Sequence, residues 1–443
     1  MRMKLNKSSQ LLLVSAASLL VAGLLTACGT LTVDFVFVSS SKAAGPNNYG
    51  EIDVFEVNSE SGVMRQIPTS PFPSGGRNPV AEAVSSDNAD LYVVNHDDNT
   101  IVQFVIGNDG KLYPQNTVNT PGVFPMAVAV SGSNLFVVDT YQPLPTCSPA
   151  APCSGSIAVF PITPGNSTTA SGLGDPVANP NPNVSGSYWP LSVPGMQTHV
   201  IVPTAVTTAT SGGNTYLYVS AYDSSETPNA GYVFGFWVTP TNTTLSAVPS
   251  NVSCLLSSNS PGTTPIPAGT LCAVNVSPVA AGVYPSAIAG DSAGSYLYVT
   301  DFTKGNVLSF AINGGSLTAV NGSPFPAGNQ PSAIIVDPKY PYLYVANSLD
   351  STVEAYSINS GALSYLDGSS SPKIYSTGSQ PTAIGIDPSS HHYLYTANFL
   401  GGTMSSFQLS STDGTLIDSQ FSPYAANAQP TAIAAIPHGS TTK

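Results

Sequence analysis

The sequence is poor in charged side chains, and in basic ones above all. Only 8% of its residues are charged, against about 25% in an average soluble protein. Eleven basic side chains stand against 24 acidic ones, which gives a net charge of −13. That charge repels a phosphate backbone, and no basic patch offsets the repulsion. Nucleic acid is therefore not expected as a partner.

Residues that stabilise exposed helices are also scarce. Glycine and proline, which interrupt helices, number 39 each, while Glu, Lys and Arg are few. These numbers exclude an all-helical protein. Hydrophobic residues make up 42% of the chain, so we expect a large core beneath an unusually neutral surface.

The N-terminal residues have the three parts of a secretory signal. Basic residues precede an apolar run over 11–25, and small residues then lead to Cys28. This order resembles the lipobox of bacterial lipoproteins, in which cleavage before the cysteine leaves a lipid on its thiol. Residues 1–27 are thus predicted to be a lipoprotein signal peptide. Lipid on Cys28 would hold the protein at a membrane of the cell envelope, on the periplasmic or cell-surface side. An ordinary signal peptide or a short membrane anchor is the alternative.

Four further cysteines suggest disulfides, because an exported chain with an even number of thiols usually pairs them. Three connectivities are possible, and the simplest joins neighbours within two loop-like segments. A zinc site is the alternative, but no C-x-x-C spacing and no nearby histidine support it. The cysteines are Cys147, Cys153, Cys254 and Cys272.

A repeat organises the rest of the chain. "YPSAIAGDSAGSYLYVTD" from Tyr284, "QPSAIIVDPKYPYLYVAN" from Gln330 and "QPTAIGIDPSSHHYLYTAN" from Gln380 are three copies of one pattern. Each copy contains four short β-prone segments separated by turn residues, and periods of 40–50 residues are typical of propeller blades. The prolines that open the copies are Pro79, Pro125, Pro203, Pro285, Pro331, Pro381 and Pro430.

The two ends of the chain complement each other. After Pro430 the sequence holds one innermost strand, "TAIAAIP", whereas "DFVFVSS", "EIDVFEVN" and "MRQIPTSPF" near the start match strands two, three and four. The predicted fold is therefore all-β, a seven-bladed β-propeller whose last blade combines N-terminal strands with the C-terminal strand. Residues 28–443 form this single domain, with loop insertions at about 140–200 and 222–282.

Strand two ends at the same face of every blade, which we call the mouth face. Both insertions are expected to leave from strand two and to overhang it. Five strand-two ends are Asn or Asp, which either cap their own turns or form a ring of binding oxygens. Calcium on that ring is a weaker alternative; otherwise no metal or cofactor is predicted. The five residues are Asn95, Asp139, Asp301, Asn347 and Asn398.

The repeated "YLYVAN" and "YLYVTD" strands, the "PTAI" openings and the "DP" turns resemble those of the seven-bladed lactonase-like propellers. That group is related to bacterial 6-phosphogluconolactonase and to proteins with YVTN repeats. The resemblance implies the propeller fold, and lactone hydrolysis as the first activity to test if the protein is an enzyme. It assigns no catalytic residue here.

Four residues near the mouth face are candidates for lactone chemistry, which needs an acid or base and a group that stabilises an oxyanion. They are Arg77, Glu82, His96 and His199. In the alternative interpretation Arg77 pairs with Glu82 or with water, and both histidines are ordinary surface residues. The sequence thus leaves two hypotheses. One is an anchored module that binds a small molecule, glycan or protein at the mouth face, and the other is a hydrolase of an uncharged lactone.

Overall fold

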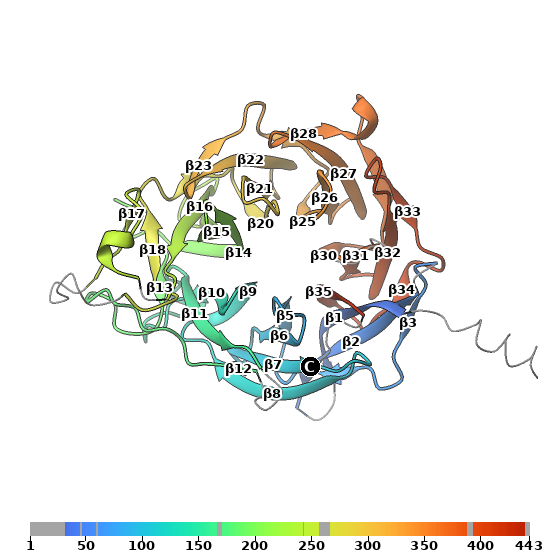
Figure 1. Ribbon diagram of the computed structural model, residues 1–443, viewed down its shortest axis with the longest axis horizontal. Coiled ribbons are helices and arrows are strands. Elements are labelled where there is room, and N and C mark those ends of the chain that lie inside the picture. The colour runs from blue at the N-terminus through green and yellow to red at the C-terminus, as the bar shows by residue number, and fades with distance from the viewer. Residues whose placement is uncertain are drawn as a thin grey trace, which may run out of the picture.

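The chain forms a ring of seven β-sheets around a central axis (Figure 1). The computed structural model describes residues 32–44, 47–58, 61–165, 171–241, 243–256, 266–387 and 393–438. The predicted seven-bladed propeller is confirmed, while the predicted signal peptide and Cys28 lie outside the described residues. Neither described helix, η1 (Leu245–Ala247) or η2 (Leu366–Gly368), has the length or apolar character to span a bilayer.

Each blade begins with an innermost strand, and strand two pairs with it in antiparallel fashion. Blades 1 to 7 contain the innermost strands β5 (Pro79–Val84), β9 (Val123–Ser131), β14 (Ile201–Ser211), β20 (Pro285–Gly290), β25 (Pro331–Val336), β30 (Pro381–Ile386) and β35 (Pro430–Pro437). In the same order, the second strands are β6 (Asp90–Asn95), β10 (Asn134–Tyr141), β15 (Asn214–Asp223), β21 (Tyr296–Asp301), β26 (Tyr342–Asn347), β31 (Tyr393–Asn398) and β1 (Thr32–Ala44).

Strand three follows on the outside, and strand four forms the rim of each blade. The third strands are β7 (Thr100–Ile106), β11 (Ser156–Thr163), β16 (Ala230–Val238), β22 (Asn306–Asn313), β27 (Thr352–Asn359), β32 (Thr403–Leu409) and β2 (Tyr49–Asn58). The rim strands are β8 (Leu112–Asn119), β12 (Gly172–Leu173), β13 (Trp189–Pro190), β17 (Val252–Ser253), β18 (Leu271–Val274), β19 (Val279–Ala280), β23 (Ser316–Ala319), β24 (Phe325–Pro326), β28 (Ala362–Tyr365), β29 (Lys373–Ser376), β33 (Leu416–Asp418), β34 (Tyr424–Ala425), β3 (Met64–Gln66) and β4 (Phe72–Pro73).

The rim differs from the prediction of four strands per blade. In every blade except blade 1, two short segments that pair with strand three take the place of strand four, and in blade 3 a third segment, β17, pairs with one of them, β18. In four blades a cis Ser-Pro step lies at the interruption, and proline cannot donate a ladder hydrogen bond. The serine hydroxyl instead accepts an N–H of strand three, as in Ser70 with Val54 (2.8 Å) and Ser323 with Ser309 (2.9 Å).

The two ends of the chain meet in blade 7, as predicted. β1 pairs with β35 in antiparallel register, with Val36 opposite Ala435 and Val38 opposite Ile433. The sheet order β3-β2-β1-β35 completes the blade, so three strands come from the start of the chain and one from its end. This pairing closes the ring by backbone hydrogen bonds.

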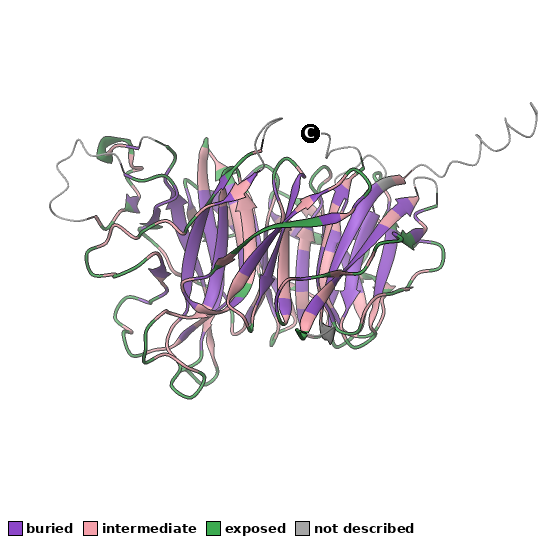
Figure 2. Cartoon of the chain, turned by 90° about the horizontal axis from the view of Figure 1, so that it is seen from below, coloured by how far each residue is buried: buried purple, intermediate pink, exposed green. Residues whose placement is uncertain are grey.

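The hydrophobic core lies between the blades. The described residues form seven buried clusters, each shared by two neighbouring sheets. In β1, Phe35 and Phe37 pack with blade 1, whereas Val36 and Val38 pack with blade 6. Successive side chains of a strand point to opposite faces, so each sheet supplies two cores. Figure 2 shows the result: the strands are largely buried and the exposed residues lie mostly in loops, which accounts for the low charge.

Hydroxyl side chains link neighbouring innermost strands near the mouth face. The residue after an opening proline donates a hydrogen bond to the carbonyl oxygen of the next opening proline. The bonds are Ser286 to Pro331 (2.6 Å), Ser332 to Pro381 (2.7 Å), Thr382 to Pro430 (3.3 Å) and Thr431 to Pro79 (2.7 Å). These bonds connect blades 4, 5, 6, 7 and 1 in turn. They explain why serine or threonine follows the opening proline in blades 4 to 7.

The insertions are placed differently from one another. Residues 142–155 and 191–200 of the first insertion extend the mouth face, as expected. The expectation for the second insertion was wrong, because only 224–229 separate β15 from β16. Its extra residues, 239–270, lie between strands three and four, whose link is at the opposite face. The predicted local disulfides are confirmed, and their pairs are Cys147–Cys153 and Cys254–Cys272.

Candidate functional site

The polar residues that end strand two are buried rather than exposed at the mouth. The Asp301 carboxylate accepts backbone N–H bonds from Val283 (2.7 Å) and Thr303 (3.0 Å), whereas the Asn347 amide has no hydrogen-bond partner among the described residues. Turn capping is therefore supported at Asp301. Roles in ligand or calcium binding stay predictions that this geometry does not favour. Each of the five residues is 0% exposed: Asn95, Asp139, Asp301, Asn347 and Asn398.

Arg77 is already paired at the mouth face. Its guanidinium contacts the Asp98 carboxylate, with 2.6 Å between Nη2 and Oδ1, and its own N–H donates to the same group at 2.7 Å. The Arg77 side chain is 51% exposed, so this ion pair lies in solvent. The expected alternative pairing of Arg77 with Glu82 is wrong, because Asp98 is the partner.

Glu82 lies on β5 and faces blade 7. Its Oε2 accepts a hydrogen bond from the Ser39 hydroxyl, while its Oε1 is buried and has no hydrogen-bond partner among the described residues. Burial raises the pKa of Glu82 to about 7, although the hydrogen bonds from Ser39 and from the backbone of Ala434 oppose that shift. A carboxyl group with such a pKa can give up or take a proton near neutral pH.

His96 follows strand two of blade 1 and is held on two sides. Its Nδ1 lies 2.6 Å from Asp97 Oδ1, which also accepts a hydrogen bond from the Asn78 amide at 3.1 Å. The imidazole stacks on Phe124 of blade 2, with 4.7 Å between ring centroids and 9° between the planes. His96 is therefore part of a contact between two blades.

His199 lies in the link that leads to β14 in blade 3. Its Nδ1 is 2.5 Å from Oδ2 of the buried Asp223 and 3.7 Å from Oε1 of Glu226. The strands β14 and β15 extend beyond the opening proline in this blade, since Ile201 pairs with Asp223. This extension places the three side chains together at the mouth face.

The structure does not assemble the four candidates into one catalytic centre. No hydrogen bond or ion pair described for them joins any two of Arg77, Glu82, His96 and His199. Each instead has its own partners, and five cavities found in the described part of the chain are lined by other residues. Their catalytic roles stay predictions.

Aromatic side chains form a curved row along the mouth face, which we call the aromatic arc. Phe124 contacts Tyr141 (6.1 Å between centroids), and Tyr284 contacts both Tyr222 (4.4 Å) and Phe302 (5.7 Å). Burial raises the pKa of Tyr222 to about 12, and Tyr284 and Tyr141 raise it further. The six partly exposed members are His96, Phe124, Tyr141, Tyr222, Tyr284 and Phe302.

The backbone at Phe124, a member of the arc, has a left-handed conformation. Phe124 precedes an opening proline and has a φ of 59°, a left-handed conformation that a bulky side chain rarely adopts. The Asn99 side chain accepts the Phe124 N–H at 2.7 Å and helps to hold this conformation. Asn78 and Gln330 occupy the same position of their blades with a φ of 54° each. The left-handed conformation is thus a feature of the repeat, and in blade 2 it carries an aromatic side chain.

One end of the arc opens into a cavity at the mouth face. The cavity has a volume of about 350 Å³ and joins the strand-two turn of blade 4 to the start of blade 5. Phe302 supplies an aromatic wall, Lys304 a cation, and Asn329 and Gln330 amides. The remaining lining residues are Thr303, Gly305 and Leu349.

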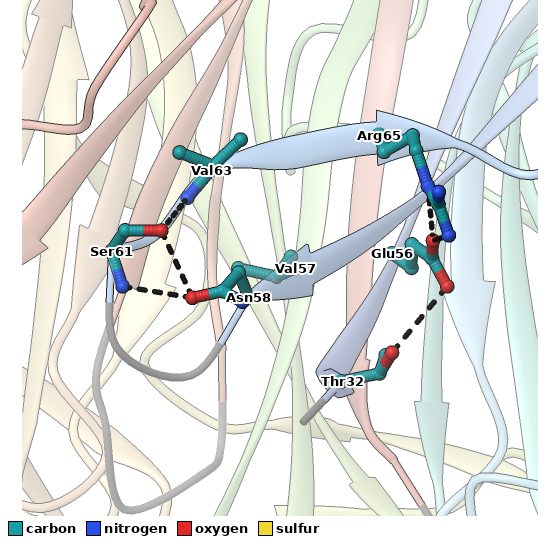
Figure 3. Close-up of a pocket in the computed structure, with 7 residues that line it drawn as sticks. All are labelled: Thr32, Glu56, Val57, Asn58, Ser61, Val63 and Arg65. Carbon is teal, nitrogen blue, oxygen red and sulfur yellow. Dashed lines mark hydrogen bonds and ion pairs between the residues drawn. The ribbon is translucent and has the colours of Figure 1, made fainter. Parts of the chain in front are cut away.

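A second cavity, of about 270 Å³, lies at the rim of blade 7 (Figure 3). Glu56 pairs there with Arg65 at 2.5 Å and accepts a hydrogen bond from Thr32 at 3.4 Å. Because Thr32 begins β1, this cavity lies toward the opposite face. Its charged groups satisfy one another, and we assign it no function.

Sequence reasoning missed the arc although its signal was present. Each member either precedes an opening proline or follows, within two residues, the strand-two position that is Asn or Asp in five blades and Ala221 in blade 3. The residue before an opening proline and the residue after strand two come together at the mouth face only when neighbouring blades pack side by side. The sequence of a single repeat does not show this contact. The partners Asp98 and Glu226 were missed because surface carboxylates carry no pattern of their own.

Comparison with known proteins supports the architecture. The family profile described as "Lactonase, 7-bladed beta-propeller" matches residues 36–171 and 276–440. No curated protein matches the chain.

Solved structures share the fold at low sequence identity. A 6-phosphogluconolactonase, described as putative, from Bacteroides fragilis is 19% identical, with a TM-score of 0.63 over 92% of this chain and 99% of that one. The periplasmic gluconolactonase PpgL of Pseudomonas aeruginosa is 18% identical, with a TM-score of 0.59 over 91% and 99%. At such identities the likeness shows the fold alone.

Glu82 should make the protein less stable as pH rises. Its folded-state pKa of about 7 exceeds the ordinary 4.5, so the folded state holds the proton more tightly than the unfolded chain. This contribution is complete below pH 4.5 and is lost as pH rises through about 7, at a cost of up to about 3 kcal/mol. Glu82→Gln, which stays neutral, should flatten the profile of unfolding free energy measured in urea between pH 5 and 8.

The matched control is Glu56→Gln at the rim, which should leave the pH profile unchanged. Burial also raises the pKa of Asp139 to about 7 and that of Asp53 to about 6. These two groups should therefore preserve part of the decrease in unfolding free energy with pH in every variant. An identical slope in wild type and Glu82→Gln would contradict the buried-acid assignment.

Proposed function

Because the chain belongs to the seven-bladed β-propeller lactonase family, we propose that it is a ligand-binding propeller of the cell envelope. Its mouth face binds an uncharged, ring-shaped ligand of the saccharide type. The aromatic arc is the observation that carries this proposal, since it presents partly exposed rings from neighbouring blades in one row.

The chemistry of the arc suits a saccharide. A sugar ring has apolar C–H faces and a rim of hydroxyls, so it can lie on an aromatic face and form hydrogen bonds at its edge. Tyr141, Tyr222 and Tyr284 supply hydroxyls beside such faces, and the cavity next to Phe302 adds amide groups. Anionic ligands are disfavoured, because the net charge is −13 and Arg77 is already paired with Asp98.

The proposed location follows from the N-terminal motif and the two disulfides. Disulfides persist in oxidising compartments, which suits an exported protein. β1 runs from Thr32 toward the mouth face, where Ser40 lies opposite Pro430. Lipid on Cys28, four residues before Thr32, would therefore hold the opposite face toward the membrane and present the arc to solvent.

Lactone hydrolysis is the second candidate function. Glu82 favours it, because its Oε1 is buried without a partner and its pKa of about 7 suits a general base. The pairing of His199 with Asp223 is a second acid–base arrangement on the same face. The separation of these groups makes hydrolysis the less supported function.

Saccharide binding is tested at Tyr284, which contacts two other members of the arc. On a panel of neutral oligosaccharides, the wild type should bind at least one, and Tyr284→Ala should weaken that binding by about tenfold in calorimetry. Tyr113→Ala on the rim strand β8, where the side chain is 49% exposed, is the matched control and should bind normally. Absence of any saccharide binding by the wild type, or equal losses in both variants, would refute the proposal.

Hydrolysis is tested with a panel of uncharged lactones. If Glu82 is the base, the wild-type rate should rise as pH increases through about 7, because the base must be deprotonated. Glu82→Gln should then lower kcat by about 100-fold or more, whereas Glu56→Gln should not. A wild-type rate equal to the uncatalysed rate would leave ligand binding as the function.

The anchor is tested by expression in bacteria with a labelled fatty acid. Wild-type protein should carry the label and sediment with membranes, and Cys28→Ala should do neither. Label that persists in the Cys28→Ala variant would show that Cys28 is not the lipidated residue.

A further inference from the structure

One cluster of side chains on blade 3 has the composition of a metal site. His199 comes from the link before β14, Asp223 ends β15, and Glu226 lies in the short link to β16. One donor atom from each residue lies within 4.8 Å of the other two. The cluster thus joins the end of the first insertion to the extended hairpin of blade 3.

The backbone around the cluster is fixed by hydrogen bonds. The Ser154 hydroxyl donates to the His199 carbonyl oxygen at 3.1 Å, and the His199 N–H donates to the carbonyl oxygen of Met196 at 3.1 Å. On the other side, the Ser225 N–H donates to Asp223 Oδ1 at 2.9 Å, which leaves Oδ2 facing the imidazole. Such supporting contacts orient metal-binding side chains in known sites.

The two carboxylates of the cluster, Asp223 and Glu226, favour binding of a cation. Asp223 is 0% exposed, and no lysine or arginine forms an ion pair with it or with Glu226 in the part of the chain that the structure describes. The nearby Tyr232 is affected by both acids, since burial and then the charges of Asp223 and Glu226 raise its pKa. Two carboxylates this close to each other, one of them buried, are costly without a positive partner.

The donor set distinguishes among metals. An imidazole nitrogen with two carboxylate oxygens suits zinc, which takes three protein ligands and keeps a fourth position for water in open sites. Calcium prefers about six to eight oxygen ligands and rarely accepts a histidine. We propose that His199, Asp223 and Glu226 bind a zinc ion at the mouth face.

This site goes beyond the proposed ligand-binding function and does not depend on it. Asp223 follows Tyr222 of the aromatic arc directly, so a bound ion would fasten the first insertion beside the arc. The Glu226 side chain is 46% exposed and the His199 side chain 25% exposed, which leaves the ion open to solvent. Zinc would therefore stabilise the mouth of the propeller and expose one position for a further ligand.

The test uses the full-length exported protein, stripped of metal with a chelator and titrated with zinc chloride. Calorimetry should show one zinc bound per chain, and Tm should rise with zinc concentration. His199→Ala and Glu226→Gln should each weaken zinc binding by about tenfold or more. Glu226→Gln is included because the Glu226 side chain is 46% exposed and lies outside the hydrophobic core, and circular dichroism checks the fold of both variants.

His438→Ala is the matched control, because His438 is a histidine that lies outside the cluster of three. It should bind zinc as the wild type does. Calcium chloride should leave Tm unchanged. The proposal is overturned if the wild type binds no zinc, if folded His199→Ala and Glu226→Gln bind it with wild-type affinity, or if calcium binds as tightly as zinc.

Discussion

The pairing of β1 with β35 is the constraint on which the rest of the structure depends. A propeller blade is apolar on both faces, so an open ring would leave two of them uncovered. By joining both chain ends in one sheet, the protein covers every face, and β1 contributes alternate side chains to the cores on either side of blade 7. The hydroxyl of Thr431 then continues the chain of bonds between innermost strands to the carbonyl of Pro79.

The packing of consecutive blades positions the aromatic arc. Every opening proline and every strand-two end lies at one face, so residues that lie far apart in sequence become neighbours across the blades. His96 stacks on Phe124 in this way, and Tyr222 contacts Tyr284, although the whole of strands three and four of blade 3 separates them in sequence. At the ends of strand two, Asp139 and Asp301 accept backbone N–H bonds from the links that precede the opening prolines. The mouth face thus combines rigid, buried polar supports with partly exposed aromatic side chains.

The sequence predicted the fold well because the repeat encodes it locally. The copies that open with proline marked the blades. One strand remains at the C-terminal end of the repeats and three at the N-terminal end, which together make one blade and indicated the closure. The disulfides were predicted because each joins two cysteines of the same loop-like segment. The interrupted rim strands were not predicted, because the role of Ser70 and Ser323 as substitutes for a ladder bond appears only when strand three lies beside them. The second insertion was misplaced because its strand three, β16, was read as part of the loop.

The candidate site was predicted less well, because its contacts join different repeats. Arg77, His96 and His199 were correctly placed at the mouth face, but their carboxylate partners could not be selected from sequence spacing. The partner of Glu82 is Ser39 in the composite blade, a pairing that depends on ring closure. The aromatic residues of the arc occupy turn positions in the sequence, and their contacts with one another appear only in three dimensions.

Hydrogen exchange of the full-length protein measures the closure most directly. Backbone amides in 34–40 and 430–437 should exchange as slowly as those of the central strands β6 and β26, because opening the β1–β35 pair requires the ring to come apart. Rapid exchange in both terminal segments, with continued protection of β6 and β26, would show that the ring is stable without this pairing and would contradict the account.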